Sequence, residues 1–318
     1  MNRFCEAKSG LAAVLSVSRG NRVLEPATGG KRRCLACGSG LDPLQIPSLK
    51  TYRRCTACGM MLDLARTGSE STELLIRHYI GVDPHEEVAA SKAAFFRLAL
   101  KELNVQVTQR PRRLMDVGCS YGYFLEMAAA AEWGVLGVEI VPEAVRIARK
   151  RVPAGQVFEG DLRQARLDKG CLEAVTLWDV LDQVEDPAAE LKESHRILAP
   201  GGTISIRVRN AASQLWIHRC YCRIEWLWRM LGLKPPSTFH RYSFSREAIE
   251  RLLAETGFVH ISARNSPLTQ GDPYRHAPIR RIAGTGKRVV GALAEVLYRL
   301  TGGRRLIAPS LLVWAQKP

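Results

Sequence analysis

The stretch that decides the fold is RRLMDVGCSYGYFLEMAAAA, residues 112–131. It predicts a buried strand over residues 114–117, a turn that begins at Gly118, and then a helix. A second strand, predicted over residues 135–140, carries an acidic side chain, Glu139, near its end. Glu139 lies 21 residues after Gly118, the separation at which a βαβ unit places a carboxylate on ribose hydroxyls. The stretch therefore predicts a nucleotide-type ligand at this turn.

Three kinds of site compete for the turn. Residues 118–122, GCSYG, also match the G-x-S-x-G nucleophile elbow of α/β-hydrolases. A hydrolase would need a glycine cluster for its oxyanion loop upstream, and residues 67–111 offer none. A dinucleotide site prefers G-x-G-x-x-G, in which Ser120 would be a glycine. The third pattern, D-x-G-x-x-x-G from Asp116 with a following acid, resembles motif I of class I methyltransferases, which use S-adenosylmethionine (SAM).

Strands and helices alternate after this stretch. Helices are predicted over residues 142–151 and 187–198, and strands over residues 156–159, 171–178 and 203–208. This alternation predicts an α/β fold, in which helices cover both faces of a parallel sheet. Ligands of such sheets bind at the carboxyl edge of the strands. Acidic residues lie at the ends of four predicted strands: Asp116, Glu139, Asp161 and Asp179.

Later stretches carry the same resemblance. Residues 177–187, LWDVLDQVEDP, look like the family's loop after its fourth strand, and residues 196–202, RILAPGG, look like the turn into its fifth. The resemblance covers about residues 72–317. It is closest to the branch that includes quinone-biosynthesis O-methyltransferases and proteins encoded with surface-polysaccharide enzymes. It implies a seven-stranded Rossmann-like sheet that ends in an antiparallel pair, over residues 259–263 and 311–315.

The resemblance also implies site residues. SAM would be bound by residues at the carboxyl edge: Asp116, Gly118, Cys119, Ser120, Gly122, Glu139, Asp161, Leu162 and Asp179. An O-methyltransferase needs a base near the acceptor hydroxyl, and the candidates are Asp182 and His240. Members of the quinone branch carry Glu-x-x-Glu-His after the fourth strand and can bind a divalent metal there. This chain has Asp179, Asp182 and Gln183 at those positions, so we do not expect a metal-assisted mechanism.

A four-cysteine pattern precedes the predicted α/β domain. Cys34 and Cys37 form one C-x-x-C pair and Cys55 and Cys58 form another, with seventeen residues between the pairs. A glycine follows each pair, as in rubredoxin-like knuckles, where it relieves crowding as amides turn toward sulfur. Four thiolates at this spacing predict a zinc ribbon. The zinc would be structural, because four protein ligands leave no open coordination position.

These motifs divide the chain into three parts. Residues 1–30 are predicted to be a flexible tail, residues 31–66 the zinc ribbon and residues 67–318 the methyltransferase domain. A cap at residues 210–242 interrupts the domain, and its three tryptophans predict an acceptor pocket or a small core within the cap. A segment at residues 279–300 predicts a basic amphipathic helix, which would lie on a membrane surface or pack against the sheet.

Charge is distributed unevenly along the chain. Of the formal net charge of +15, residues 1–66 supply +7 (11 basic and 4 acidic) and residues 275–318 supply +8 (9 basic and 1 acidic), so the part between them is neutral overall. Basic flanks favour an anionic partner, either phospholipid or nucleic acid. No apolar run approaches 18 residues, and the apolar run at residues 11–17 is short for a signal sequence. The use of cysteine fits a reducing cytoplasm.

Together these observations predict SAM-dependent O-methylation of a small-molecule, sugar or lipid-linked acceptor. The protein would be cytoplasmic, with peripheral contact to anionic lipid on the inner membrane face. The alternative is an RNA methyltransferase that binds RNA through the ribbon and the basic flanks. The chain lacks the Asn-Pro-Pro-Tyr stretch of base-amine methylation and a cysteine pair for pyrimidine-carbon methylation. Nucleic acid is therefore the less favoured partner.

Overall fold

The computed structural model describes residues 33–66, 85–108, 110–230, 240–269 and 291–318. The predicted tail and residues 67–84, the first part of the predicted methyltransferase domain, lie outside these residues. The last part of the cap, residues 231–239, and the first part of the basic segment, residues 279–290, also lie outside them.

Seven strands form the main sheet, in the order β10-β11-β8-β7-β4-β5-β6. Five of them run parallel to their neighbours: β4 (Arg113–Val117), β5 (Gly134–Glu139), β6 (Gln156–Glu159), β7 (Leu172–Trp178) and β8 (Leu198–Arg209). The edge pair β10 (Val259–Asn265) and β11 (Ser310–Gln316) is antiparallel, and β11 also runs antiparallel to β8. The Rossmann-like seven-stranded sheet expected from the sequence is confirmed. Strand order reverses at β4, which is where open α/β sheets bind ligands.

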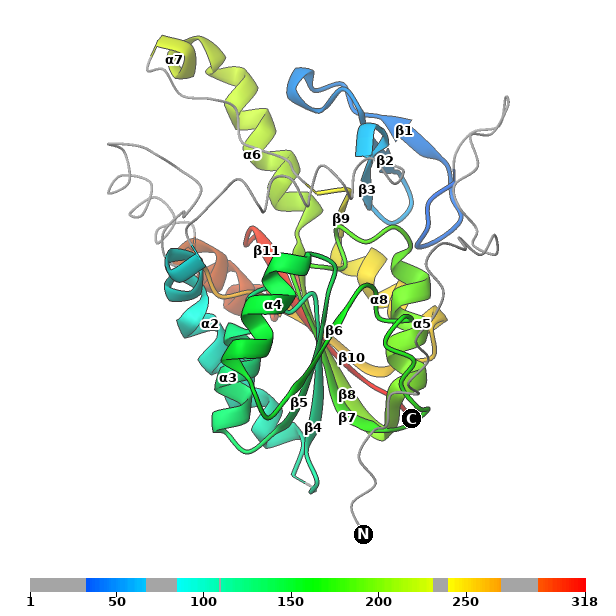
Figure 1. Cartoon of the computed structure of the whole chain (residues 1–318). Helices are drawn as coiled ribbons and strands as arrows, with labels where there is room; N and C mark the ends of the chain where they lie inside the picture. The colour runs from blue at the N-terminus through cyan, green and yellow to red at the C-terminus, as the bar shows by residue number, and fades with distance from the viewer. Residues whose placement is uncertain (1–32, 67–84, 109, 231–239, 270–290) are drawn as a thin grey trace.

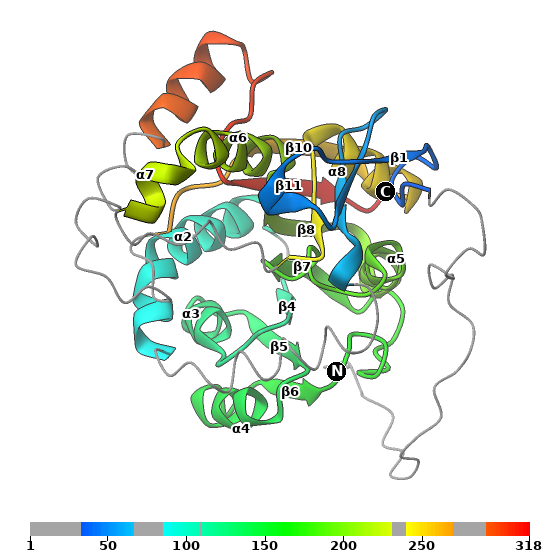
Figure 2. The same ribbon diagram turned by 90° about the horizontal axis from the view of Figure 1, so that it is seen from above.

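Helices cover both faces of this sheet (Figures 1 and 2). One face carries α2 (His85–Gln106), α3 (Tyr123–Ala130) and α4 (Pro142–Arg151), and the other carries α5 (Pro187–Ile197) and α8 (Arg246–Glu255). Alternate side chains of β4 therefore enter two separate cores. Leu114 packs in the core that contains Phe95 of α2, whereas Met115 packs in the core on the opposite face, and both are 0% exposed. Burial on both faces explains why the strands are apolar almost throughout.

A smaller sheet joins the cysteine-rich region to the rest of the protein. It consists of β1 (Leu41–Pro43), β2 (Tyr52–Cys55), β3 (Met61–Asp63) and β9 (Tyr242–Ser243), with short 3-10 helices η1 (Pro47–Leu49) and η2 (Leu64–Arg66) between them. The fourth strand, β9, lies at the C-terminal end of the cap, and the sequence did not predict this pairing. The Tyr52 hydroxyl also donates to the His240 carbonyl oxygen, at 3.0 Å. The small sheet therefore stands over the carboxyl edge of the large one (Figure 1).

The cap contains α6 (Ala211–Arg223) and α7 (Glu225–Met230). The side chain of Asn210 caps α6 by accepting from the Ala212 amide at 3.0 Å. The buried side of α6 packs on the small sheet, where Leu215 meets Leu49 and Met61. Trp216 and Trp226 are 60% and 67% exposed, so these two tryptophans do not form a core of the cap.

A helix over residues 291–300 follows within the basic segment. Its Ala294 is 1% exposed, but four larger apolar side chains point to solvent: Leu293, Val296, Leu297 and Leu300, at 54%, 51%, 39% and 78% exposure. In the part of the chain that the structure describes, no helix is both long enough and apolar enough to cross a bilayer.

Candidate functional site

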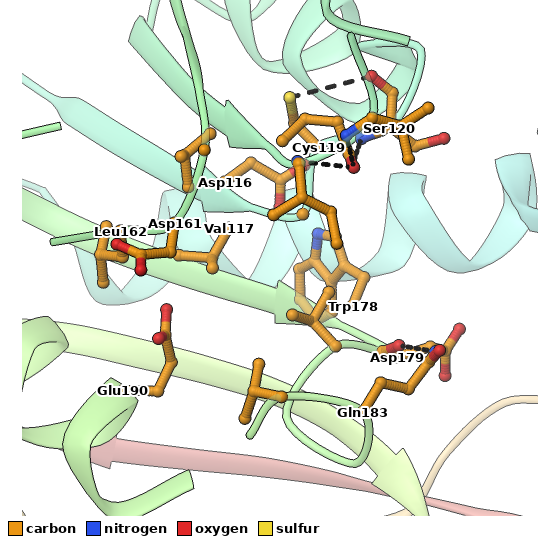
Figure 3. Close-up of a pocket in the computed structure, with 18 of the residues that line it drawn as sticks. Asp116, Val117, Cys119, Ser120, Asp161, Leu162, Trp178, Asp179, Gln183 and Glu190 are labelled. Atoms are coloured by element: carbon orange, nitrogen blue, oxygen red, sulfur yellow. Dashed lines mark hydrogen bonds between the residues drawn. The ribbon is translucent and has the colours of Figure 1, made fainter. Parts of the chain in front are cut away.

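A cavity of about 370 Å³ opens at the carboxyl edge, where strand order reverses (Figure 3). Its walls come from α2, the turn after β4, the end of β5, the turn after β6, the loop after β7 and the start of α5. Eight of the nine residues that the resemblance implies for the cofactor line it: Asp116, Gly118, Cys119, Ser120, Glu139, Asp161, Leu162 and Asp179. Gly122 is not among the lining residues.

The turn after β4 depends on two glycines with left-handed backbone. Gly118 has φ +68°, and a Cβ added there would lie 2.4 Å from Cγ2 of Val180 in the loop after β7. Gly122 has φ +77°, and its Cβ would lie 3.1 Å from that of Ala148 on α4. Side chains at these positions would strain the backbone and push neighbours away. Gly122 therefore packs the start of α3 against α4, while Gly118 leaves room at the cavity.

Glu139 connects this turn to the end of β5. Its Oε2 accepts from the Ser120 amide at 2.9 Å, and its Oε1 accepts from the amides of Ile140 at 2.8 Å and Val141 at 3.0 Å. Burial raises the pKa of Glu139, and these three hydrogen bonds oppose that rise. A carboxylate has about four acceptor positions, so one on Oε2 remains for a ligand hydroxyl.

Asp116 lies deeper, on β4 itself. Its Oδ1 accepts from the Thr176 hydroxyl at 2.6 Å, and the residue is 2% exposed. Burial raises the pKa of this carboxyl to about 7, although the Thr176 hydrogen bond and the charge of Lys92 act in the opposite direction. Nearby on the cavity wall, the buried Nε1 of Trp178 has no hydrogen-bond partner among the residues that the structure describes. A bound ligand could accept from it.

Asp179 begins the loop after β7 and is held by two cations. Lys92 Nζ and Arg207 Nη1 both donate to its Oδ2, at 2.9 and 2.8 Å. Burial alone would raise the pKa of Asp179, but Arg207 and then Lys92 outweigh that effect and hold the pKa well below its usual range. The cluster of two cations and one carboxylate carries a local charge of +1 beside the cavity. The backbone of Asp179 has φ +63°, which is unusual for a residue other than glycine.

The residues at the quinone-branch metal position do not fit a divalent metal. The Asp179 carboxylate is already paired with Lys92 and Arg207. Asp182 is 0% exposed and directed elsewhere, and Gln183 uses its Nε2 to donate to the Asp179 carbonyl oxygen at 2.8 Å. Lys92 and Arg207 already balance the charge of the Asp179 carboxylate, which a divalent metal would otherwise do.

Asp182 and His240, the two base candidates, lie together but do not line the cavity. His240 Nδ1 is 3.0 Å from Asp182 Oδ2. Arg209 Nε donates to His240 Nε2 at 2.9 Å, so the ring proton of a neutral His240 resides on Nδ1. Asp182 thus lies beside the imidazole without a hydrogen bond to Nδ1, and Arg209 occupies the lone pair of Nε2.

The four predicted metal ligands also come together. The Sγ atoms of Cys34, Cys37, Cys55 and Cys58 all lie within 4.8 Å of one another. The Cys34–Cys58 and Cys37–Cys55 separations are 3.5 and 3.4 Å. Tetrahedral zinc with Zn–S bonds of about 2.3 Å requires S···S separations of about 3.8 Å, so the donor set fits zinc.

Sequence reasoning missed several residues of the cavity wall, namely Lys92, Trp178, Glu190 and, behind Asp179, Arg207. Lys92 and Glu190 lie within helices, where a charged residue is normally solvated and gives no signal. Arg207 could have been noticed as a charge inside the apolar run of β8, since a buried arginine requires a partner.

Comparisons with known proteins agree with this architecture. Residues 89–263 match the sequence model of the family described as methyltransferase domain. A ubiquinone biosynthesis O-methyltransferase of Xanthomonas oryzae pv. oryzae is 28% identical over 142 residues, which are 43% of this chain and 57% of that protein. A 37.1 kDa uncharacterized protein in transposon TN4556 of Streptomyces fradiae is 35% identical over 96 residues, 28% of each. The matches thus span about a quarter to somewhat over half of these relatives' lengths.

A solved structure is similar as well. Geranyl diphosphate C-methyltransferase from Streptomyces coelicolor A3(2) aligns with a TM-score of 0.46 and 16% identity, over 70% of this chain and 76% of that one.

The Asp179 cluster predicts a pH-dependent loss of stability. Replacing Arg207 by Met should lower the free energy of unfolding at neutral pH by on the order of 2 kcal/mol, because Asp179 keeps only Lys92. The ion-pair part of this difference should decline as the pH falls below about 4, where Asp179 becomes protonated in the unfolded chain, and should vanish only when the pH also falls below the depressed pKa of folded Asp179. Urea denaturation of both proteins at the two pH values measures the effect. Arg110→Met, which removes an exposed ion pair with Glu132, is the control and should change little.

Proposed function

Because the chain belongs to the methyltransferase-domain family, we propose that it transfers a methyl group from SAM to a hydroxyl of a small-molecule, sugar or lipid-linked acceptor. The observation that carries the proposal is the convergence of residues from four successive βα units on one cavity. The ubiquinone biosynthesis O-methyltransferase among the relatives supports oxygen as the accepting atom.

The resemblance to class I methyltransferases implies the cofactor roles, and the hydrogen bonds of Glu139 support its part. Glu139 accepts from a ribose hydroxyl through the free position on Oε2, while its three amide bonds hold the carboxylate still. Asp116, Gly118 and Ser120 line the methionine and ribose part. Asp161 accepts from the adenine amine. When bound, SAM supplies an electrophilic methyl group on a sulfonium.

Methyl transfer is an in-line displacement. The acceptor oxygen forms a bond to the methyl carbon as the S–C bond breaks, and the electron pair of the S–C bond stays on sulfur. Positioning and exclusion of water do most of the work. The positive cluster of Lys92 and Arg207 around Asp179 favours the developing negative charge on the acceptor oxygen. His240 takes the hydroxyl proton once the acceptor replaces Arg209 at Nε2. Asp182 then faces the resulting imidazolium.

Methyl-labelled SAM tests this proposal. We expect the purified chain to transfer label to a lipid or sugar-nucleotide fraction of cell extract and not to RNA. Glu139→Gln should weaken binding of S-adenosylhomocysteine by about 1–3 kcal/mol, because it removes an acceptor and disturbs the amide contacts. Glu126→Gln, on the exposed side of α3, is the matched control. Label in RNA alone would favour the RNA enzyme, and wild-type affinity in Glu139→Gln would contradict the cofactor site.

We also propose that the four cysteines hold one structural zinc. The thiol geometry and the left-handed glycines after each pair, Gly38 and Gly59, support this assignment. The Gly38 amide donates to the Cys34 carbonyl oxygen at 2.8 Å, and the Gly59 amide donates to that of Cys55 at 3.0 Å, so both knuckles have the same tight turn.

Metal analysis of protein purified under reducing conditions should give one zinc per chain. Cys55→Ser should lose the zinc and destabilise the small sheet, because binding free energy of a structural site is folding free energy. Cys220→Ser, a substitution outside the cluster, should retain it. Metal-free wild-type protein with an intact small sheet would contradict the zinc site.

Finally, we propose peripheral contact with anionic membrane through the helix over residues 291–300. Its four exposed apolar side chains support burial in the lipid interface, and Arg299, Arg304 and Arg305 lie on or directly after it with exposed side chains. A lipid-linked acceptor would be reached from such a position.

Liposome flotation checks the membrane proposal. Leu293→Glu should reduce co-flotation with anionic vesicles severalfold, because it removes apolar burial and adds a negative charge. Val105→Glu, at a 71% exposed apolar position on α2, is the matched control and should not. Equal flotation of both variants, or none of the wild-type protein, would contradict this contact.

A further inference from the structure

The indole of Trp178 forms part of the cavity wall, and its one polar atom is unpaired. Trp178 is the last residue of β7 and is 6% exposed. Its Nε1 is buried and has no hydrogen-bond partner among the residues that the structure describes. Trp133, at 4% exposure, instead donates from its Nε1 to Asn104 Oδ1 at 2.8 Å. A buried donor without an acceptor is costly, so an unpaired N–H at a cavity wall indicates a ligand.

Packing fixes the orientation of the Trp178 ring. Phe95 of α2 and Phe124 of α3 both meet it edge to face, with ring centroids 5.1 and 5.3 Å away. Two residues earlier on the same face of β7, Thr176 pairs with Asp116 of β4 and donates to its Oδ1. The ring therefore lies one step nearer the carboxyl edge than the buried Asp116 carboxyl. Figure 3 shows the indole between Asp116 and the loop after β7.

The place of Trp178 along the sheet edge identifies the part of the cofactor that would reach it. In the proposed SAM site, Asp161 after β6 holds the adenine, Glu139 at the end of β5 holds the ribose, and the turn after β4 holds the methionine part. β7 is the next strand in the same direction. The part of the cofactor that lies toward β7 is therefore its amino-acid end.

An indole N–H can only donate, so its partner must be an acceptor. At the amino-acid end of SAM, the ammonium only donates and the sulfonium is positively charged, which leaves the carboxylate. Charge agrees with this choice, because Lys92 and Arg207 outnumber Asp179 at this end of the cavity and the carboxylate is the one anionic group of SAM. We propose that Trp178 Nε1 donates a hydrogen bond to the methionine carboxylate of the cofactor. This role rests on the proposed SAM site.

Calorimetry with two ligands tests this role: S-adenosylhomocysteine and its decarboxylated analogue, which keeps the sulfur and the amine. The wild-type protein should prefer S-adenosylhomocysteine. Trp178→Phe keeps an aromatic ring but lacks the N–H, so this preference should fall by about 10-fold or more, the usual effect of losing a hydrogen bond to a charged group. Altered packing around the smaller ring affects both dissociation constants, so their ratio isolates the hydrogen bond.

Trp133→Phe is the matched control, because it removes an equally buried indole N–H whose partner is Asn104, away from the cavity wall. It should lower the midpoint of thermal unfolding and leave the ratio of the two dissociation constants unchanged. A wild-type ratio in Trp178→Phe, or a wild-type protein that does not distinguish the two ligands, would overturn the carboxylate contact alone. Absence of S-adenosylhomocysteine binding by the wild-type protein would overturn the cofactor site with it.

Discussion

The carboxylate of Glu139 is the contact on which the rest of the site depends. Three backbone amides from two different turns converge on it, one from Ser120 after β4 and two from Ile140 and Val141, between β5 and α4. Amides at such turns need an acceptor, because buried N–H groups without one are costly. Glu139 therefore holds the two turns together, and the left-handed Gly118 of the first turn lies close against Val180 of the loop after β7.

The cavity has ends of opposite charge. Acids gather near the turn after β6 and the start of α5, with Asp161 and Glu190 on facing walls. Cations gather at the end of β8, where Lys92 and Arg207 share Asp179. In a small, partly buried space these charges are weakly screened, so each end selects ligand groups by charge as well as by shape. A nucleoside that binds at the acidic end would direct its reactive part toward the cationic end.

The cysteine-rich region is joined to the carboxyl edge of the main sheet and is not a separate appendage. Its sheet includes β9, and the Tyr242 amide of β9 donates to the Asp182 carbonyl oxygen at 2.9 Å. The Tyr52 hydroxyl donates to the carbonyl oxygen of His240. The carbonyl oxygen of the next residue, Arg241, accepts from the Asp63 amide. Any metal that stabilises this sheet would therefore also support the proposed base. This link joins residues that are almost 190 positions apart in the chain.

Much of the architecture could be read from local patterns. The strands at residues 114–117 and 156–159, the helix at residues 142–151 and the cysteine spacing all depend on near neighbours and on burial, which leave periodic traces in a sequence. Local patterns also indicated the four strand-end acids of the cavity, because acids at the strand ends of a parallel sheet must meet at one edge.

Tertiary structure alone decided the contacts between distant parts of the chain. Arg207 and Lys92 meet at Asp179 only because α2 covers the end of the sheet, and β9 pairs with β3 only because the chain returns from the cap beside the ribbon. In the sequence, Glu190 looks like an ordinary exposed glutamate of a helix, and only the packing of α5 places it in the cavity wall. Such contacts carry no periodicity, since the partners of a buried charge are set by packing in three dimensions and not by separation along the chain.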